Sequence, residues 1–485
     1  AHDHFRLYQA VRTFAPKQSN HRIQLRNSDG TLATPSQEAD MLQRCLQDLY
    51  HADKEVHSPT SFQWPFTTTD MMNGFLKLPL MKSLAPSYAP APVWHMAAPE
   101  IADFLHPHLT YLSAVGRLPQ EWSDGSLTFL TKPGRQGKAP SDLRPIALLE
   151  PTGKVVLGLA ASQLLQETWW MLRMIPQFAY VPDRGVADAI SRLMHHTSQV
   201  RTLLQQFQYP YHRAASGHSA PDLMGGLTIS LDLSKAFDQV RRDLLFKGLE
   251  DLQVSPDLQH LLQSIYHHTH FEFTYKGEYR QFETLKGIRQ GCKCAPILWT
   301  LYFVQIFVAL HEYSPWQWLQ RCLTAFADDI CQHDIFHSQD DFIVLLRRAG
   351  HLMDCLEHAG LPINVDKTVA LCRMNGRKLQ QTHKRFFLKN SRGTFLKIPR
   401  GDGSTTLIQL VNNHTYLGVK LSYFNPEKLT MTHRLQAGTR TQQLLHKWLH
   451  LKRGLNPRQR VKIWQQCVYT SSVHGLIHTG FEVAH

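Results

Sequence analysis

The chain has 485 residues, 43% hydrophobic and 19% charged, proportions typical of a globular protein with several subdomains rather than a disordered chain. No apolar stretch approaches the roughly 20 residues that a membrane span requires, so no membrane partner is expected. Eight cysteines without metal-ligand spacing predict reduced thiols in an intracellular protein.

The formal net charge of +13 is concentrated towards the end of the chain. Residues 373–400 contain nine Lys or Arg and no acid, and residues 425–485 contain nine more against two acids. Aromatic side chains such as Phe386 and Trp464 lie among these basic residues. The combination favours binding of a polyanion over a merely solvated surface.

The first third of the chain predicts mixed secondary structure. Residues 21–50 predict a strand, an Asp-Gly turn, a second strand and then a helix capped by Ser36. A Pro-rich connector follows at residues 77–94, helical patterns resume at Ala98, and residues 126–132 predict a strand.

Later segments alternate between buried and amphipathic patterns. Residues 154–165 predict a buried helix, and a polar, Gly-containing loop precedes an apolar strand at 227–233. The tail from Thr432 predicts two amphipathic helices separated by Gly454 and Pro457.

Two pairs of adjacent aspartates occur in different surroundings. Asp340 and Asp341 follow Ser338 at the start of an amphipathic pattern, where acids complement the helix dipole. Asp328 and Asp329 instead lie between apolar residues without a capping residue, as in a hairpin whose turn presents both acids. Like charges repel strongly in such a setting, so this second pair favours a bound divalent cation.

A third acid strengthens this interpretation. Asp232 lies at the end of the apolar strand predicted at 227–233 and is followed by the helix start "SKAFD". A strand-end acid beside a hairpin with two acids is a layout that holds two Mg²⁺ ions in a phosphoryl-transfer site, with Mn²⁺ as a substitute. The expected metal ligands are Asp232, Asp328 and Asp329.

Seven segments, in chain order, resemble the motifs of reverse transcriptases over about residues 113–422. "LDLSKAFD" and "FADD" resemble the two catalytic motifs. The others are "LTFLTKPGRQGKAPSDLRPIALL", "PQFAYVPDRGVADAI", "GIRQGCKCAPILW", "GLPINVDKT" and "YLGVKL". Ala179 stands where the family usually has Gly, and Cys292, Lys293 and Cys294 replace the usual residues after the "RQG" motif. The chain is most similar to the non-LTR (LINE-type) retrotransposon branch.

The resemblance implies an α+β, right-hand polymerase fold with fingers, a palm containing an antiparallel sheet, and a helical thumb. Residues 1–112 resemble the connector between endonuclease and polymerase, residues 113–422 the fingers and palm, and residues 423–485 a basic thumb. Neither an endonuclease nor a zinc knuckle is recognised in this sequence.

The resemblance also implies residue roles. Asp232, Asp328 and Asp329 become the catalytic residues. The residues expected to bind the incoming dNTP are Lys132, Arg144, Phe237, Gln290 and Lys367. The residues expected at the template and primer are Arg184, Gly291, Tyr416, Leu417 and Gly418.

Several of these roles have an alternative. Arg135 and Lys138 compete with Lys132 for the triphosphate, whereas Arg144 offers bidentate donors. Phe237 would exclude a 2′-hydroxyl, or is simply a core residue. Lys367 is a general acid for pyrophosphate or a solvated lysine, and Arg184 contacts template backbone or braces the fingers.

The implied function is that of an RNA-directed DNA polymerase, which uses two Mg²⁺ to add dNTPs to a primer 3′-OH. Its partners would be an RNA template and a DNA primer at a nicked target, in the nucleus; the oligomeric state is not predicted. An RNA-dependent RNA polymerase is disfavoured, because this chain has "RQG" and "ADD" where those enzymes carry S-G-x-x-x-T and G-D-D. A nucleic-acid-binding relic and a group II intron maturase remain alternatives. The intact acids argue against the relic, and the lack of a recognisable maturase or HNH tail argues against the maturase.

Overall fold

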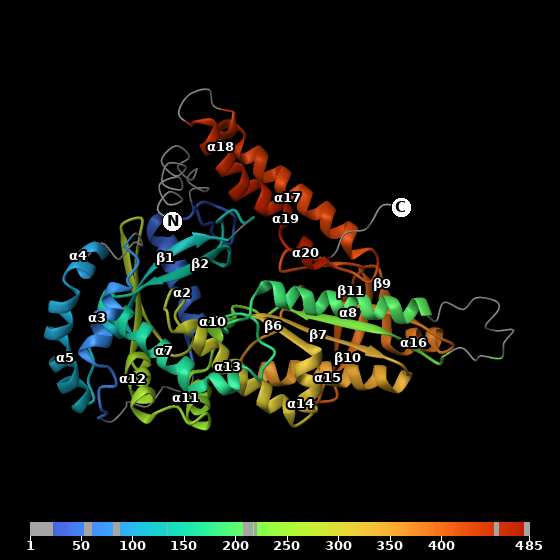
Figure 1. Cartoon of the computed structure of the whole chain (residues 1–485), viewed down its shortest axis with the longest axis horizontal. Helices are drawn as coiled ribbons and strands as arrows, with labels where there is room; N and C mark the ends of the chain where they lie inside the picture. Colours follow the sequence, from blue (N-terminus) through green and yellow to red (C-terminus); the bar gives the residue numbers. More distant parts are fainter. Residues whose placement is uncertain are drawn as a thin grey trace. The chain divides into compact units, whose positions relative to one another are not determined.

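The computed structural model describes residues 23–52, 61–80, 88–132, 134–206, 217, 221–450 and 455–479 (Figure 1). The chain divides into two compact units. Unit 1 comprises Ala1–Arg173, Lys235–Gln305 and Ala359–Leu361, and unit 2 comprises Met174–Ser234, Ile306–His358 and Pro362–His485. Both units combine helices with strands, which confirms the predicted α+β class. Gly454, expected to separate two helices, lies outside the described residues.

Unit 1 contains a four-stranded sheet in the order β2-β1-β4-β5. Its strands are β1 (Gly125–Thr131), β2 (Leu143–Leu148), β4 (Thr269–Tyr275) and β5 (Glu278–Thr284). The β1–β2 and β4–β5 pairs are antiparallel, and β1–β4 is parallel. Pro145 is compatible with β2 because β2 is an edge strand, where a missing backbone donor is tolerated. The strand predicted at 126–132 is confirmed as β1.

Unit 1 also contains helices. They are α2 (Pro35–Tyr50), α3 (Thr68–Leu76), α4 (Ala91–Met96), α5 (Ala98–Ala114), α6 (Gln120–Ser123), the 3₁₀ turn η1 (Pro140–Asp142), α7 (Pro151–Leu172), α10 (Ala236–Gln239), α11 (Arg242–Asp251) and α12 (Pro256–Tyr266). Helix α2 packs against β5 of this sheet. Helix α13 (Ala295–His311) begins in unit 1 and ends in unit 2. Buried residues recur along α7, which confirms the buried helix predicted at 154–165.

The start of α2 differs from the prediction. Its cap is Thr34 rather than Ser36: the Thr34 backbone is extended and its hydroxyl accepts from the backbone N–H of Gln37. Pro35 occupies the first helical position, where a missing N–H costs nothing, so Ser36 lies inside the helix. The two strands expected before α2 reduce to one bridge, between Arg26 and Leu32.

Unit 2 is built on a seven-stranded sheet in the order β6-β7-β3-β8-β11-β10-β9. Its strands are β3 (Met224–Leu231), β6 (Leu323–Phe326), β7 (Asp329–Phe336), β8 (Val369–Asn375), β9 (Phe387–Asn390), β10 (Gly393–Pro399) and β11 (Thr405–Leu410). All neighbours are antiparallel except β8–β11. Every residue of β3 is buried, which explains its continuous apolar run. A separate hairpin joins β12 (His414–Tyr416) and β13 (Val419–Leu421).

Helices cover both faces of this sheet. On one face lies α8 (Val186–Gln206), whose Val200 packs against Gly226 of β3. On the other face lies α15 (Gln339–His358), where Gln332 of β7 donates to the carbonyl of Leu345. Asp340 and Asp341 belong to the first turn of α15, which confirms their predicted place. Figure 1 shows α8 and α15 on opposite sides of the strands.

The remaining helices of unit 2 are α14 (Trp316–Cys322), α16 (Leu379–Phe386), α17 (Pro426–Leu449), α18 (Pro457–Ile463), the π-helical turn η2 (Trp464–Tyr469), α19 (Thr470–Val473) and α20 (Leu476–Thr479). The helical tail was predicted from Thr432, but α17 begins earlier, at Pro426, whose fixed φ suits a first turn. Along the described ranges, no helix is both long and apolar enough to cross a membrane. All eight cysteines are free thiols.

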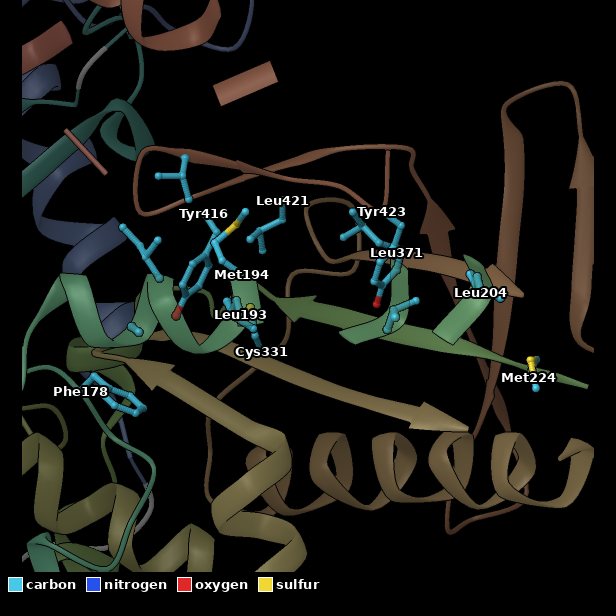
Figure 2. Packing of buried hydrophobic residues seen from close by; sticks show 14 residues of the cluster. Phe178, Leu193, Met194, Leu204, Met224, Cys331, Leu371, Tyr416, Leu421 and Tyr423 are labelled. Carbon is cyan, nitrogen blue, oxygen red and sulfur yellow. The ribbon is translucent and has the colours of Figure 1, made fainter. Parts of the chain in front are cut away.

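The core of unit 2 joins the β12–β13 hairpin to the sheet. Tyr416, Leu421 and Tyr423 pack with Met194 of α8 and with Cys331 of β7 (Figure 2). The hairpin is therefore fixed to the face of the sheet that α8 covers.

Candidate active site

Asp232 follows directly on the last residue of the central strand β3. Its backbone is held on both sides: its N–H donates to the Thr368 hydroxyl (3.2 Å), and its carbonyl accepts from the N–H of Asn364 (2.8 Å). The next residue, Leu233, bridges Ile363. A buried strand and a fixed backbone thus place Asp232 at the C-terminal end of the central strand.

Asp328 and Asp329 lie where β6 turns into β7, as the sequence predicted. Phe326 pairs with Asp329, so the turn consists of Ala327 and Asp328. Ala327 has φ = 55°, a left-handed backbone that a residue with a Cβ adopts at a cost of roughly 1–2 kcal/mol. Something outside the hairpin must stabilise this turn.

Gln177, which the sequence reasoning did not single out as a site residue, provides that support. Its side chain is fully buried, accepts from the backbone N–H of Ala327 (2.9 Å) and donates to the Ala327 carbonyl (3.1 Å). The N–H of Phe178 also donates to the carbonyl of Ala325 on β6 (2.8 Å). In the sequence, Gln177 was marked only by its place in "PQFAYVPDRGVADAI". That motif does not reveal a contact with Ala327, 150 positions away.

Asp328 and Asp232 both act electrostatically on Asp329. Partial desolvation, together with the charges of Asp328 and Asp232, raises the pKa of Asp329 to about 6. Burial and the charge of Asp328 raise the pKa of Tyr180 as well. Unit 2 therefore brings together the three acids that the sequence proposed as a group.

Lys367 lies beside Asp232. Its ammonium nitrogen is 3.5 Å from a carboxylate oxygen of Asp232, and its side chain is largely exposed.

Within the described ranges, no three His, Cys, Asp or Glu side chains converge closely enough to form a metal site. The donor chemistry of Asp232, Asp328 and Asp329 nonetheless suits Mg²⁺, because all three offer hard carboxylate oxygens and repel one another at neutral pH.

Tyr416, Leu417 and Gly418, which were expected at the primer, lie in the β12–β13 hairpin. Leu417 (φ = 45°) and Gly418 (φ = 88°) form its left-handed turn, and Tyr416 ends β12 with a buried side chain. His414 approaches Ser230 of β3, with Nε2 3.3 Å from the hydroxyl oxygen. The hairpin therefore contacts the strand that carries Asp232.

Arg184 contacts the backbone of the segment that contains Gln177. Its guanidinium donates to the backbone carbonyls of Ile175 and Gln177 and lies over the ring of Phe178. These contacts hold the segment that supports the β6–β7 turn. The two roles left open for Arg184, contact with the template backbone and bracing of the fingers, stay predictions.

A second group of predicted residues gathers in unit 1. Gln290 donates to both carboxylate oxygens of Asp238, each at 3.0 Å, and the backbone N–H of Ile288 donates to the carbonyl of Phe237 (2.9 Å). The half-buried Phe237 ring stacks on Trp299, with centroids 5.0 Å apart.

Asp238 is almost fully buried, and burial raises its pKa although hydrogen bonds from Tyr50 and Gln290 oppose the shift. The Tyr50 hydroxyl donates to the Asp238 carboxylate at 2.8 Å. Tyr50 lies in the predicted helix of the N-terminal segment, and its hydroxyl joins this buried network. Since the contact joins residues far apart in the chain, the sequence offered no signal for it.

The other predicted residues of unit 1 lie around its sheet. A Cβ on Gly291 (φ = 111°) would meet the carbonyl oxygen of Ala147 at 2.6 Å, so glycine is required for close packing against β2. Lys132 donates to the carbonyl of Ser141 (2.8 Å), and its charge partly opposes the rise that burial causes in the pKa of Asp238. Arg144 is exposed on β2.

The raised pKa of Asp329 leads to a stability prediction. The folded state binds the Asp329 proton more tightly than the unfolded state, so ionisation reduces stability between pH 3.8 and about 6, and the loss is complete above that range. Asp329→Asn should therefore raise the free energy of unfolding at pH 7.5, in EDTA, by about 1 kcal/mol or less, because exposure screens the repulsion.

Urea denaturation at pH 7.5 and pH 4 measures this gain, which should vanish at the lower pH. Asp340→Asn, in the first turn of α15, is the matched control and should not be stabilised. An equal gain for Asp329→Asn at both pH values would contradict the prediction.

A largely antiparallel sheet, with one acid directly after its central strand and a hairpin that presents two more, defines the palm of a right-hand polymerase. The chain belongs to the reverse transcriptase (RNA-dependent DNA polymerase) family, whose sequence profile matches residues 130–421. Members of this family generally use divalent metal ions.

The chain is similar to two named relatives, one from a transposon and one from a mobile element. The chain is 24% identical over 217 residues to the probable RNA-directed DNA polymerase from transposon BS of Drosophila melanogaster, covering 44% of this chain and 21% of that protein. It is 26% identical over 192 residues to the RNA-directed DNA polymerase from mobile element jockey of Drosophila funebris, covering 39% and 19%. The chain thus spans about a fifth of the length of each relative. Among solved structures, the apo telomerase of Candida tropicalis truncated from its C-terminal domain is similar at 12% identity and a TM-score of 0.40, covering 72% of this chain and 62% of that one.

Proposed function

We propose that this chain is an RNA-directed DNA polymerase of a LINE-type retrotransposon, which adds dNTPs to the 3′-OH of a primer on an RNA template. The observation that carries the proposal is the placement of Asp232, Asp328 and Asp329 within electrostatic reach of one another in unit 2. Family membership and the two named relatives support it.

In this proposal the three aspartates hold two Mg²⁺ ions. When bound, such ions would stabilise the negative charge that develops on the attacking 3′-oxygen and on the leaving pyrophosphate. Asp232 and Asp329 supply carboxylate oxygens from neighbouring strands, and the β6–β7 turn presents Asp328. Lys367, with its ammonium next to Asp232 and exposed to solvent, is suited to donate a proton to the departing pyrophosphate.

We assign the contacts with the nucleotide to unit 1. Arg144 is exposed and carries a planar fork suited to phosphate oxygens, and Lys132 contributes a second positive charge. Gln290 and Asp238 form a hydrogen-bonded pair beside Phe237. Phe237 is held by Trp299, so its exposed part is a rigid wall for the sugar.

The basic segments support binding of nucleic acid. Arg377 and Lys378 pair with Asp222, at 2.6 and 2.9 Å, but the other basic residues from α16 to β10 are largely exposed. Phosphate contacts from such residues make affinity depend steeply on salt. We propose that they bind the template–primer duplex, with the hairpin at Tyr416–Gly418 against the primer end.

Primer extension tests the proposal. The wild-type chain, with Mg²⁺ and dNTPs, should extend a DNA primer annealed to an RNA template. If the chain binds RNA but does not extend the primer, the polymerase proposal is wrong and the alternative of a nucleic-acid-binding relic is supported. Extension that starts at a nick in supplied duplex DNA would support target priming, and nuclear location of the tagged chain would support the retrotransposon assignment.

Phe237→Ala should weaken the discrimination against ribonucleotides, because the missing ring leaves space for a 2′-hydroxyl. The expected effect is a loss of about 10–100-fold in the ratio of kcat/KM for dNTP over rNTP. Steady-state single-nucleotide incorporation measures this ratio. Phe237→Tyr keeps the ring and should retain the selectivity, and an unchanged ratio in Phe237→Ala would reduce Phe237 to a packing residue.

A further inference from the structure

A cavity of about 490 Å³ lies in unit 2 at the outer edge of β7. Strand β6 pairs with β7 only as far as Gln332, so the rest of β7, from His333 onward, borders the cavity instead. Its other walls come from α8, from α14 and from α15. Figure 1 shows α8 and α15 on the two sides of β7. No residue proposed above for the polymerase reaction lines this cavity.

Three arginines from different helices face this space. They are Arg192 of α8, Arg321 of α14 and Arg348 of α15. Two nitrogens of Arg192, Nε and Nη2, are buried without a hydrogen-bond partner among the described residues. The Arg348 guanidinium lies over the Trp318 ring, with 4.3 Å from Cζ to the ring centroid.

Two of these guanidinium groups, those of Arg192 and Arg348, are partly desolvated, whereas Arg321 is exposed. Burial is the main factor that lowers the pKa of Arg192 and of Arg348. An arginine that has lost water without gaining an acceptor is unfavourable, because its buried donors remain unmet. A bound anion would restore the missing hydrogen bonds.

The acids that line the cavity already have partners. Asp334 accepts from Trp318 Nε1 (2.6 Å) and from the N–H of Ile335 (2.8 Å), and Arg321 lies 4.0 Å away. Asp341 accepts from the N–H of His337 at the start of α15 (3.0 Å). The cavity therefore keeps an excess of positive charge with unmet donors at Arg192.

The buried histidines of the lining are also engaged. His196 Nε2 is 2.9 Å from the Tyr423 hydroxyl, and His333 Nε2 is 2.9 Å from the Thr324 hydroxyl. The ring nitrogens of both histidines that face these hydroxyls are thus already hydrogen-bonded within unit 2. The arginines are the groups that can bind a ligand.

We propose that this cavity binds the phosphate group of a small phosphorylated molecule. Guanidinium forks match phosphate oxygens in geometry and charge, and Arg192 and Arg348 approach from opposite walls. The volume lies in the range of small-molecule sites, about 300–1,000 Å³, and exceeds what a single phosphate fills. The space therefore leaves room for a further group, such as a sugar or a nucleoside.

Thermal denaturation of the whole chain tests this proposal, in EDTA and at constant ionic strength set with chloride. Inorganic phosphate, ribose 5-phosphate and adenosine monophosphate are added separately. Each should raise the melting temperature, and calorimetry should show about tenfold weaker binding in Arg192→Gln and in Arg348→Gln. A larger shift with the sugar phosphate or the nucleotide than with inorganic phosphate identifies the added group.

Arg347→Gln is the matched control: the residue is adjacent on α15, exposed and absent from the lining, so binding should be unchanged. If Arg192→Gln does not fold, Arg348→Gln gives the same test from the other wall. Absence of any shift beyond that of chloride, or equal shifts in wild type and both cavity variants, would overturn the proposal.

Discussion

Asp328→Asn should lower the kcat of nucleotide addition by at least about 10²–10³-fold, while the chain remains folded. The substitution keeps the size of the side chain but removes the negative charge that the β6–β7 turn presents. Without that charge, the site loses a metal ligand and stabilises the developing charge less well. Primer extension on an RNA template with saturating Mg²⁺ and dNTPs measures the loss.

The chain contains a matched control for this experiment. Asp340 is also exposed and also followed by a second aspartate, but it lies in the first turn of α15. Asp340→Asn should leave kcat unchanged. Stability separates the two effects further: Asp328→Asn removes repulsion with Asp329 and should not lower the melting temperature. Extension by Asp328→Asn at a rate near that of the wild type would contradict the assigned role of the acids.

Local patterns in the sequence predicted the central elements of the candidate site. The apolar run at 227–233 indicated a buried strand ending on Asp232, and the structure has β3 there with every residue buried. The isolated acid pair among apolar residues indicated a hairpin, and β6 and β7 form it. Such predictions succeed because alternation, burial and turn chemistry depend on residues close together in the chain.

Contacts between distant segments could not be predicted in the same way. The hydrogen bond from Tyr50 to Asp238 and that from Ala327 to Gln177 join residues separated by 188 and 150 positions. A single sequence gives no signal of which buried side chains meet. The prediction of the α2 cap was wrong for a local reason. Thr34 and Ser36 are both good caps, and only Pro35 at the first helical position decides between them.

Gln177→Met should lower kcat by about tenfold or more and destabilise the chain by about 2–4 kcal/mol. Methionine has a similar size but can neither accept from the Ala327 N–H nor donate to the Ala327 carbonyl. Both buried groups would lose their partners, and the left-handed backbone at Ala327 would lose its support. The Asp328 carboxylate, one residue further on, would then sample orientations that do not bind metal.

Separate measurements distinguish positioning from simple loss of fold. Urea denaturation gives the stability, and single-nucleotide kinetics at a temperature where the variant is fully folded give kcat and the KM for dNTP. Because Gln177 is buried beneath the turn and makes its contacts with the backbone, kcat should fall while KM changes little. Gln205→Met, on the exposed side of α8, should alter neither quantity. A folded Gln177→Met chain with wild-type kcat would show that the hairpin keeps its acids in place without this side chain.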